Sequence, residues 1–386
     1  MRLVHAITSV DLRLGGTSRA ALDLAGAMAG RGHAVTLLTT NAIDVPAAWT
    51  ASAPGCPSSV VDAALGPRVG GQAPSEAAMS ALSGADVVHI HAMWEPFNAR
   101  VASLCRKLGV PYIVTPHGML DDWCMAQGAW KKRVYMRVVG RHMLESASAV
   151  HCTAAAELSQ SRRWFPKGQG VVVPNLMDLA PFRSLPGSSE AHERWPRLGQ
   201  HDVRLLFLSR VSPKKGVEHL LDATAVLARE GLDVVAMIAG PVDADYGKML
   251  VARAETAGIA SRIEFLGHVG GTLKFSLVGS CDMMVIPSSQ ENFGFVFFEA
   301  LAAGLPVVTT DLVDTRDELA ASGGAVIVRQ DGTSVARGIR EVLEWRSERA
   351  ARMKAAREWV FRELEPEVVS ARFEAMYSAS AATRIR

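Results

Sequence analysis

The sequence has few cysteines, little net charge and no long hydrophobic run. Its five cysteines are odd in number and widely spaced, which is typical neither of a disulfide framework nor of a zinc knuckle and favours a reducing compartment. The 41 basic and 39 acidic side chains nearly cancel, so no global field favours nucleic acid. No stretch approaches the roughly 18 apolar residues of a transmembrane helix. We therefore expect a cytoplasmic protein without a nucleic-acid partner, whose contact with the inner face of a membrane would be peripheral.

The length of the chain indicates more than one domain. At 386 residues it exceeds the size at which a single hydrophobic core usually stops growing. The apolar run at residues 1–7 is too short for the core of a signal peptide, so we interpret it as a first strand and do not expect secretion.

Short apolar runs alternate with longer segments of helical periodicity, which predicts parallel sheets in a doubly wound α/β fold. In the N-terminal half these runs are residues 3–8, 34–40, 86–91, 112–115, 149–153 and 171–173. The alternation restarts with residues 204–209, 233–239, 263–266, 283–286, 307–310 and 325–328. The sequence therefore predicts two Rossmann-like domains, residues 1–180 and 201–365.

The segments outside these domains have a different character. Residues 181–200 are rich in proline, serine and glycine and show neither period, so we predict an interdomain linker. A helical pattern runs from residue 334 to about 364 and is broken at Pro366. We expect the following helix, residues 366–386, to cross back to the N-terminal domain.

Two glycines follow the first predicted strand. Gly15 and Gly16 open a helix, and backbone N–H groups in such a turn can meet a phosphate. The full G-x-G-x-x-G pattern is absent, so a plain glycine-rich turn is equally consistent.

Three histidines fall at the ends of predicted strands, where open α/β sheets bind ligands. His89 and His91 have no third metal ligand at sensible spacing, so we expect structural roles with hydrogen bonds to the backbone. His117 lies between Pro116, which stiffens the chain, and Gly118, which permits close approach, and we predict a functional role for it.

Arg210 and Lys215 lie five positions apart between the first strand of the second domain and a helix. Such a pair can hold a diphosphate. A solvated basic loop is the alternative, but the position before a helix N-terminus favours an anion.

The segment 287–306 predicts a strand end, a turn and a helix start, with two glutamates. Glu291 lies in the turn, where Phe293 and Gly294 can offer unpaired N–H groups, and Glu299 lies about two turns further along. A carboxylate can accept hydrogen bonds from vicinal sugar hydroxyls, and free amides suit hydroxyl or phosphate oxygens. Alternatively, Glu291 caps the helix and Glu299 is a surface residue, but the apolar neighbours of Glu299 predict burial and a partner.

Two further patterns have ordinary explanations. Asp243 and Asp245 form an Asp-x-Asp tripeptide that occurs by chance, and we do not predict a metal site there. A basic cluster, formed by Lys131, Lys132, Arg133, Arg137 and Arg141, lies on one predicted helix. A solvated helix face is its common meaning, and a peripheral membrane contact is the alternative.

Together these residues resemble the signature of the retaining glycosyltransferases of family 4, the group 1 glycosyltransferases. Glu291 and Glu299 with seven residues between them match the family's glutamate pair, and Glu-Asn-Phe-Gly is a variant seen in members that assemble bacterial polysaccharides. The resemblance covers nearly the whole chain. It implies the GT-B fold, in which two Rossmann-like domains face each other across a cleft. One departure is the segment 309–314, where many relatives have two glycines.

The resemblance also implies roles for the residues. Glu299 would bind ribose hydroxyls, Arg210, Lys215 and Gly16 the diphosphate, and His117 would line the reaction centre. Glu291 and the following amides would hold the donor sugar, and His268 and Val269 would border the base. The donor-binding residues are then Gly15, Gly16, Arg210, Lys215, His268, Val269, Glu291, Asn292, Phe293, Gly294 and Glu299, and the catalytic ones His117, Arg210, Lys215 and Glu291.

The implied reaction moves a hexose from a UDP or GDP sugar to a saccharide or lipid-linked saccharide with retention, without metal or other cofactor. Arg210 and Lys215 would then stabilise the leaving diphosphate. A nucleotide-sugar epimerase of the same architecture and a non-catalytic nucleotide-sugar-binding protein are the alternatives. The spacing of Glu291 and Glu299 favours transfer over epimerisation.

Overall fold

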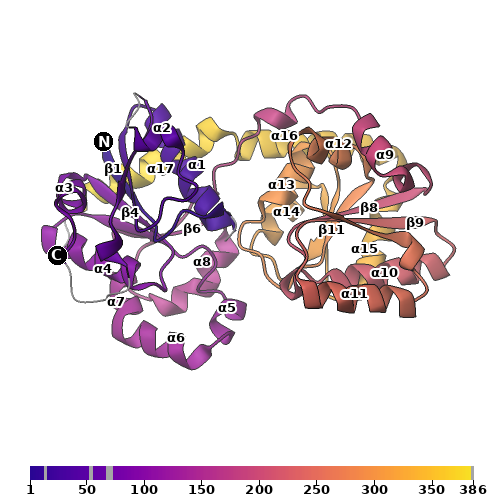
Figure 1. Cartoon of the computed structure of the whole chain (residues 1–386), viewed down its shortest axis with the longest axis horizontal. Coiled ribbons are helices and arrows are strands. Elements are labelled where there is room, and N and C mark those ends of the chain that lie inside the picture. The colour runs from indigo at the N-terminus through magenta and orange to yellow at the C-terminus, as the bar shows by residue number, and fades with distance from the viewer. Residues whose placement is uncertain (13–14, 52–54, 67–72, 384–386) are drawn as a thin grey trace. The chain divides into compact units, whose positions relative to one another are not determined.

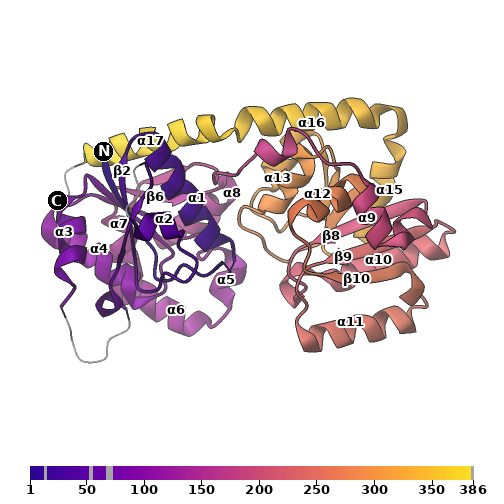
Figure 2. The same ribbon diagram turned by 45° about the horizontal axis from the view of Figure 1, so that its top comes forward.

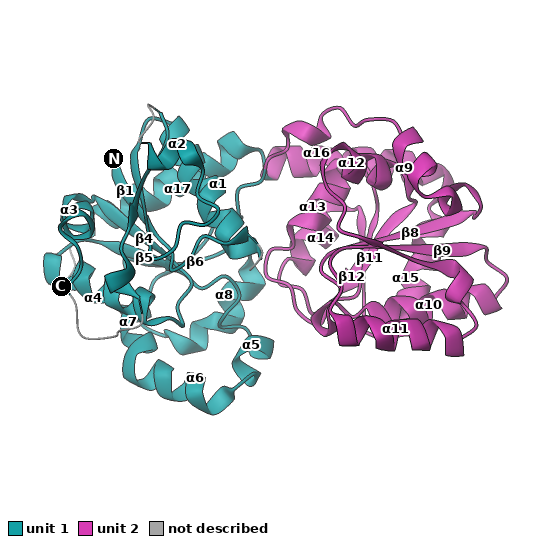
Figure 3. Ribbon diagram, in the orientation of Figure 1, with its two compact units in different colours: residues 1–177, 364–386 teal, residues 178–363 magenta. Residues whose placement is uncertain are grey.

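The computed structural model describes residues 1–12, 15–51, 55–66 and 73–383 (Figure 1). The chain divides into two compact units (Figure 3). Unit 1 comprises Met1–Met177 and Leu364–Arg386, and unit 2 comprises Asp178–Glu363. Each unit is built on one parallel sheet flanked by helices.

The sheet of unit 1 has seven strands in the order β3-β2-β1-β4-β5-β6-β7. They are β1 (Arg2–Ala6), β2 (Ala34–Thr39), β3 (Ser58–Val61), β4 (Val87–His91), β5 (Tyr112–Thr115), β6 (Ala149–Cys152) and β7 (Gly170–Val172). The strand order reverses between β1 and β4, and such a switch point opens a crevice at the carboxyl ends of the two strands. The sequence did not predict β3, because this edge strand is only partly buried and half of it is serine.

The helices of unit 1 cover two hydrophobic clusters on opposite faces of the sheet. They are α1 (Gly16–Gly30), α2 (Ala47–Thr50), α3 (Glu76–Gly84), α4 (Pro96–Leu108), α5 (Asp122–Ala126), α6 (Ala129–Tyr135), α7 (Arg141–Glu145), α8 (Ala155–Ser161) and α17 (Pro366–Ala381). Neighbouring strand residues such as Leu3 and Val4 belong to different clusters, because successive side chains point to opposite faces.

Helix α17 lies beside α1 and completes one of these clusters (Figure 2). Its residues Val369, Phe373, Met376 and Tyr377 are buried. The helix contacts β4 and α1, and these four residues share a hydrophobic cluster with residues of β1 and β2. The C-terminal helix is therefore part of the core of unit 1.

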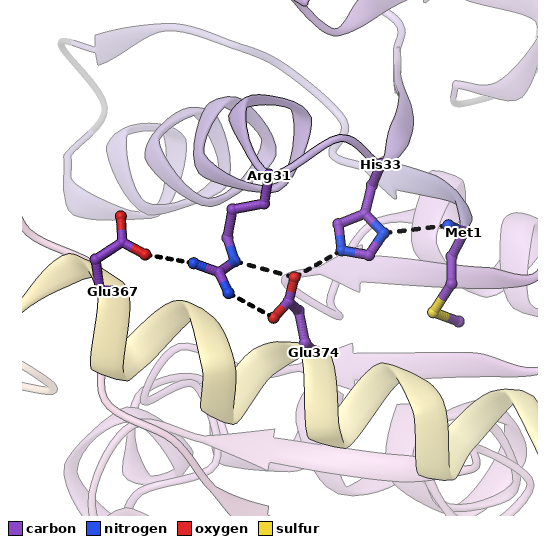
Figure 4. A network of polar contacts seen from close by, with 5 residues as sticks. All are labelled: Met1, Arg31, His33, Glu367 and Glu374. Carbon is purple, nitrogen blue, oxygen red and sulfur yellow. Dashed lines mark hydrogen bonds and ion pairs between the residues drawn. The ribbon is translucent and has the colours of Figure 1, made fainter.

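A polar network ties the same helix to the first βαβ segment (Figure 4). Arg31 pairs with Glu374 at 2.8 Å and also with Glu367. His33 contacts Glu374 through Nε2 at 2.9 Å and the amino group of Met1 through Nδ1 at 3.2 Å. The network connects residues more than 330 positions apart in the sequence.

The sheet of unit 2 has six strands in the order β10-β9-β8-β11-β12-β13, and all six fall on predicted apolar runs. They are β8 (Val203–Leu208), β9 (Val234–Ala239), β10 (Ile263–Gly267), β11 (Met283–Ile286), β12 (Val307–Thr310) and β13 (Ala325–Val328). The helices are α9 (Ser189–Arg194), α10 (Val217–Arg229), α11 (Ala244–Thr256), α12 (Gly271–Ser280), α13 (Phe295–Ala302), α14 (Arg316–Ser322), α15 (Gly332–Glu344) and α16 (Arg349–Glu363). Here the strand order reverses between β8 and β11.

Two segments differ from what the sequence predicted. Residues 181–200, predicted as an interdomain linker, belong to unit 2. They contain α9 and the buried side chains of Phe182, Trp195 and Leu198. The Pro, Ser and Gly content concealed these apolar anchors. The single long helix over 334–364 is two helices, α15 and α16, which are separated at Arg346 by a positive φ of 35°.

Candidate functional site

The loops after β8 and β11 meet at the switch point of unit 2. Ser289, which follows β11, donates hydrogen bonds from its backbone N–H at 2.9 Å and from its hydroxyl at 3.0 Å to the carbonyl of Lys214, which follows β8. Gly216 makes this approach possible, because its φ is +65° and a Cβ there would lie 2.1 Å from the carbonyl oxygen of Pro287. The fold thus brings the two predicted site segments of this unit together.

A pocket of about 370 Å³ lies at this edge of the sheet. It is lined by the ends of β8 and β9, the loop after β10, and helices α12 and α13. Four predicted donor-binding residues, Arg210, His268, Val269 and Glu299, line it together. The structure therefore gathers side chains from three separate predicted segments around one cavity.

Glu299 is positioned by α13 and by an ion pair that the sequence did not reveal. The Nζ of Lys274 on α12 lies 2.6 Å from Oε2 of Glu299, and both side chains also line the pocket. Both are largely shielded, with side-chain exposures of 22% and 27%. One carboxylate oxygen is thus fixed by Lys274, and Oε1 remains an acceptor for a hydroxyl. Lys274 was missed because only the tertiary fold brings it, from α12, to the same pocket as Glu299.

Arg210 and Lys215 have different surroundings. Arg210 is exposed at the pocket and has no ion-pair partner within the described ranges. Lys215 is buried, and its ammonium donates to Glu291. Neither Lys215 nor Glu291 lines the pocket. An ammonium has three N–H donors, so two remain on Lys215 for an anion.

The loop from Glu291 to the start of α13 presents backbone donors. No hydrogen bond is made by the amides of Asn292, Phe293 and Gly294 to any part of the chain that the structure describes. Gly294 enters the helix with a φ of +67°, without a side-chain cap. The Glu291 side chain binds Lys215 and does not cap the helix. These free N–H groups and the positive end of α13 are chemically suited to an anion or to a hydroxyl oxygen.

Residues 310–315 support this loop. The Thr310 hydroxyl donates to the carbonyl of Ser288 at 2.5 Å, and the Thr315 hydroxyl donates to that of Phe293 at 3.0 Å. The N–H of Asp314 donates to the carbonyl of Glu291 at 2.8 Å. These residues therefore hold the loop in place through its backbone carbonyls.

Unit 1 places Gly15, Gly16 and His117 near its own switch point. Gly16 begins α1 directly after Gly15, and the segment between β1 and Gly15 is only partly described. His117 follows β5 with a positive φ of 53°, which is uncommon outside glycine and keeps the ring on a fixed turn. Its Nε2 lies 3.2 Å from Nδ1 of His91. Burial lowers the pKa of His117 to about 3, so its ring is neutral near pH 7.

The expectation of backbone partners for His89 and His91 was wrong. The ring of His89 contacts Tyr377 and Thr115, and that of His91 contacts His5 and His117. Parallel pairing places these polar side chains side by side across β1, β4 and β5, and the period of one strand does not reveal its neighbours.

Asp243 has a structural role. Its carboxylate caps α11 by accepting the Tyr246 N–H at 3.2 Å, and Asp245 is exposed on the first turn of the same helix.

The basic cluster lies on α6, a π-helical turn over Met136–Gly140, and α7. Lys132 is withdrawn from this surface, because its ammonium donates to the carbonyl of Cys124 at 2.5 Å. The apolar side chains of Trp130, Val134 and Val138 are exposed by 69%, 53% and 71%. In the described ranges no helix is both long and apolar enough to span a bilayer.

This chain is similar to known proteins in sequence and in architecture. Residues 15–176 match the family described as "Glycosyl transferase 4-like domain", and residues 190–359 match "Glycosyl transferases group 1". A phosphatidyl-myo-inositol mannosyltransferase from Mycolicibacterium smegmatis is 32% identical over 58% of this chain and 57% of its own length. A glycogen synthase from Mycobacterium tuberculosis is 28% identical over 76% of this chain and 69% of its own length. The chain thus spans little more than half of the mannosyltransferase.

Among solved structures, Anabaena HepE in complex with UDP superposes with a TM-score of 0.80 at 18% identity, covering 98% of this chain and 100% of that one. The two doubly wound sheets, with a switch point in each, define a protein of the GT-B fold, which confirms the predicted fold class. With the two family matches over most of its length, the chain belongs to the group 1 glycosyltransferases of the family 4 type, as Glu291 and Glu299 predicted.

Proposed function

We propose that the protein is a retaining glycosyltransferase that moves a hexose from a nucleotide-diphosphate sugar to a saccharide or a lipid-linked saccharide in polysaccharide biosynthesis. The observation that carries the proposal is the switch point of unit 2. There a pocket lined by Glu299 and Arg210 adjoins the chain segments that hold the Lys215–Glu291 pair and the free amides before α13. A ribose, a diphosphate and a sugar each find complementary groups in this arrangement.

Within this proposal, the nucleotide occupies the pocket. Glu299 accepts hydrogen bonds from the ribose hydroxyls through the oxygen that Lys274 leaves unused. His268 and Val269 border the base, and Arg210 binds the diphosphate from the exposed side of the pocket. Lys274 supports the ribose contact by holding the carboxylate in place.

The remaining residues act on the transferred sugar and the leaving group. The free amides of Asn292, Phe293 and Gly294, together with Glu291, hold the donor sugar. Arg210, Lys215 and the start of α1 at Gly15 and Gly16 stabilise the negative charge that grows on the leaving diphosphate, so the chain itself supplies the charge that metal ions supply elsewhere. His117 contacts the reacting sugar. The acceptor attacks the face that the diphosphate leaves, which gives retention.

The names of relatives suggest the range of acceptors. One is named for phosphatidyl-myo-inositol and another for glycogen, which are a lipid-linked molecule and a saccharide. The exposed apolar and basic side chains of α6 and α7 would suit a lipid-linked acceptor, since they can contact the surface of an anionic membrane. We include this peripheral contact in the proposal.

A panel of UDP and GDP sugars, screened by thermal stabilisation, tests the donor. At a ligand concentration 100 times Kd we expect stabilisation of about 2.7 kcal/mol by one UDP or GDP sugar. The best donor is then incubated with saccharide and lipid-linked acceptors, with and without EDTA, and the product anomer is assigned by NMR. Retention in the presence of EDTA is expected. An epimerised donor would indicate the epimerase, binding without any reaction the binding protein, and no stabilisation would refute all three.

A further inference from the structure

Five histidines line the carboxyl ends of neighbouring strands in unit 1. His5, His89, His91 and His151 are at most 1% exposed, and His117 adjoins them. Burial lowers the pKa of each ring, to about 3 for His5 and about 4 for His151, so all five are neutral. A neutral imidazole has one N–H and one lone pair, so its hydrogen bonds have a direction.

A first series of hydrogen bonds begins at His151, and a backbone carbonyl determines which atom donates in each of them. The Nε2 of His151 lies 2.8 Å from the carbonyl oxygen of Val173, which only accepts, so Nε2 carries the proton. The Nδ1 of His151 then accepts from the Thr115 hydroxyl at 2.8 Å. That hydroxyl in turn accepts from Nε2 of His89 at 2.6 Å, and Nδ1 of His89 accepts from the Tyr377 hydroxyl at 2.8 Å.

This assignment argues against a metal site in the cluster. Nitrogen atoms of His5, His89 and His91 lie within 4.8 Å of one another, as three metal ligands could. However, the lone pair of His89 accepts from Tyr377, and both nitrogens of His91 contact other histidines. Metal binding would break several of these buried hydrogen bonds.

A second series of hydrogen bonds runs from His5 through His91 to His117. The Nδ1 of His5 lies 3.1 Å from Nε2 of His91, and Nδ1 of His91 lies 3.2 Å from Nε2 of His117. The buried Nε2 of His5 has no hydrogen-bond partner among the described residues. If the rings donated in the direction from His117 to His5, the Nε2 of His5 would be a buried N–H without an acceptor. If they donate in the direction from His5 to His117, the same atom has only an unused lone pair, which proteins tolerate better than an unpaired donor.

We propose that His5 and His91 are positioning residues. His5 donates to His91, and His91 donates to Nε2 of His117, which holds His117 as the tautomer protonated on Nδ1. His117 then presents a neutral N–H to an oxygen of the substrate. It acts as a hydrogen-bond donor and not as a general base. The substrate oxygen, a hydroxyl of the transferred sugar, rests on the function proposed above, whereas the tautomer does not.

The backbone around His117 is fixed in the same way. The N–H of Gly118 donates at 2.7 Å to the buried carboxylate of Glu157, whose other oxygen accepts from the N–H of Thr153 at 2.6 Å. Both the turn and the proton position of His117 are therefore determined by unit 1 itself.

Nitrogen-15 NMR of the full chain with labelled histidines tests the tautomer directly. The signals of His117 are assigned by their loss in His117→Gln. We expect the proton on Nδ1 in the wild-type protein at neutral pH. A proton on Nε2 would overturn the proposal, whether or not the protein transfers sugar and whether or not any variant folds.

Variants then test the positioning. In His91→Phe we expect His117 to populate both tautomers and the transfer rate to fall roughly tenfold, with the affinity for the nucleotide sugar unchanged. His5→Phe should act in the same direction. The matched control is His151→Phe, which removes an equally buried histidine of the first hydrogen-bond series and should leave the tautomer of His117 intact. An unchanged tautomer in His91→Phe, or equal effects in His151→Phe, would contradict the proposal.

Discussion

At the scale of residues, the two glutamates of the signature have separate partners. Glu291 pairs with Lys215 from the loop after β8, and Glu299 pairs with Lys274 from α12. Each carboxylate is thereby held by a cation from another element before it meets a ligand. The sequence predicted that Glu299 would need a partner, but the identity of the partner depends on tertiary packing.

Glu299→Ala should weaken donor binding without unfolding the protein. The variant removes the proposed acceptor for the ribose hydroxyls, and a hydrogen bond to a charged group contributes about 1.5–3 kcal/mol, which is about a 10- to 100-fold rise in Kd. Isothermal titration with the best nucleotide sugar measures this change. Asp317→Ala, an exposed carboxylate on α14 of the same unit, is the control and should bind normally. Equal Kd values for the two variants would exclude the ribose role.

At the scale of elements, the sequence predicted that the C-terminal helix returns to the N-terminal domain, and α17 does belong to unit 1. Only the structure shows which hydrophobic cluster of that unit the helix completes. The hydrogen bonds among the buried histidines could not be predicted. They depend on the strand register, in which His5 lies beside His89 and His91 lies beside Thr115. The apolar runs did locate the central strands, since buried parallel strands are continuous and hydrophobic. The edge strand β3 and the packed segment 181–200 lack that signal.

Phe373→Ala should destabilise unit 1. The ring is 1% exposed and packs against His151, so its loss leaves a cavity that costs about 3–5 kcal/mol. Denaturant unfolding, followed by probes in each unit, should show unit 1 unfolding at lower denaturant than in the wild type. Val368→Ala removes a more exposed side chain of the same helix and should have little effect. A similar loss in both variants would show that burial of α17 is not the cause.

The ion pairs of Glu374 should make the docking of α17 sensitive to acid. Hydrogen bonds from Arg31 and His33 lower the pKa of Glu374 from 4.5 to about 2. Because the unfolded chain takes up this proton first, the stabilisation is present above about pH 4.5 and is lost as the pH falls toward 2. Solvent screening limits it to about 1 kcal/mol.

Unfolding free energies of the wild type and Glu374→Gln should therefore differ by about 1 kcal/mol at pH 6 and converge toward pH 2. Glu358→Gln, an exposed glutamate on α16, provides the comparison and should give a much smaller difference. A difference for Glu374→Gln that stays constant with pH would contradict the assigned pKa.

At the scale of the whole molecule, each unit has a switch point furnished with predicted residues, and the two family matches divide along nearly the same line as the two units. Residues with a proposed role occur in both units, since the pocket with Glu299 lies in unit 2 and His117 lies in unit 1. The exposed side chains of α6 and α7 bear on the proposed membrane contact and not on the proposed transfer reaction.

Vesicle sedimentation measures the proposed membrane contact. We expect binding to vesicles with anionic phospholipid and little binding to zwitterionic ones, because each basic residue near an anionic surface contributes about 1 kcal/mol, roughly a fivefold change. The double variant Trp130→Ser with Val138→Ser and, separately, Arg137→Gln should bind more weakly. Val242→Ser, which removes an exposed apolar side chain of unit 2, should not. Equal binding of all variants would place the contact elsewhere or exclude it.

The place of α17 in the core of unit 1 also affects how the chain is made. A ribosome that has finished β7 must still synthesise all of residues 178–363 before the helix exists. At about 5–20 residues per second this takes roughly 10–40 s. During that interval the hydrophobic cluster that α17 completes stays partly uncovered on the nascent chain, while unit 2 has all the residues it needs to fold. Unit 2, although synthesised second, can therefore be the first to mature.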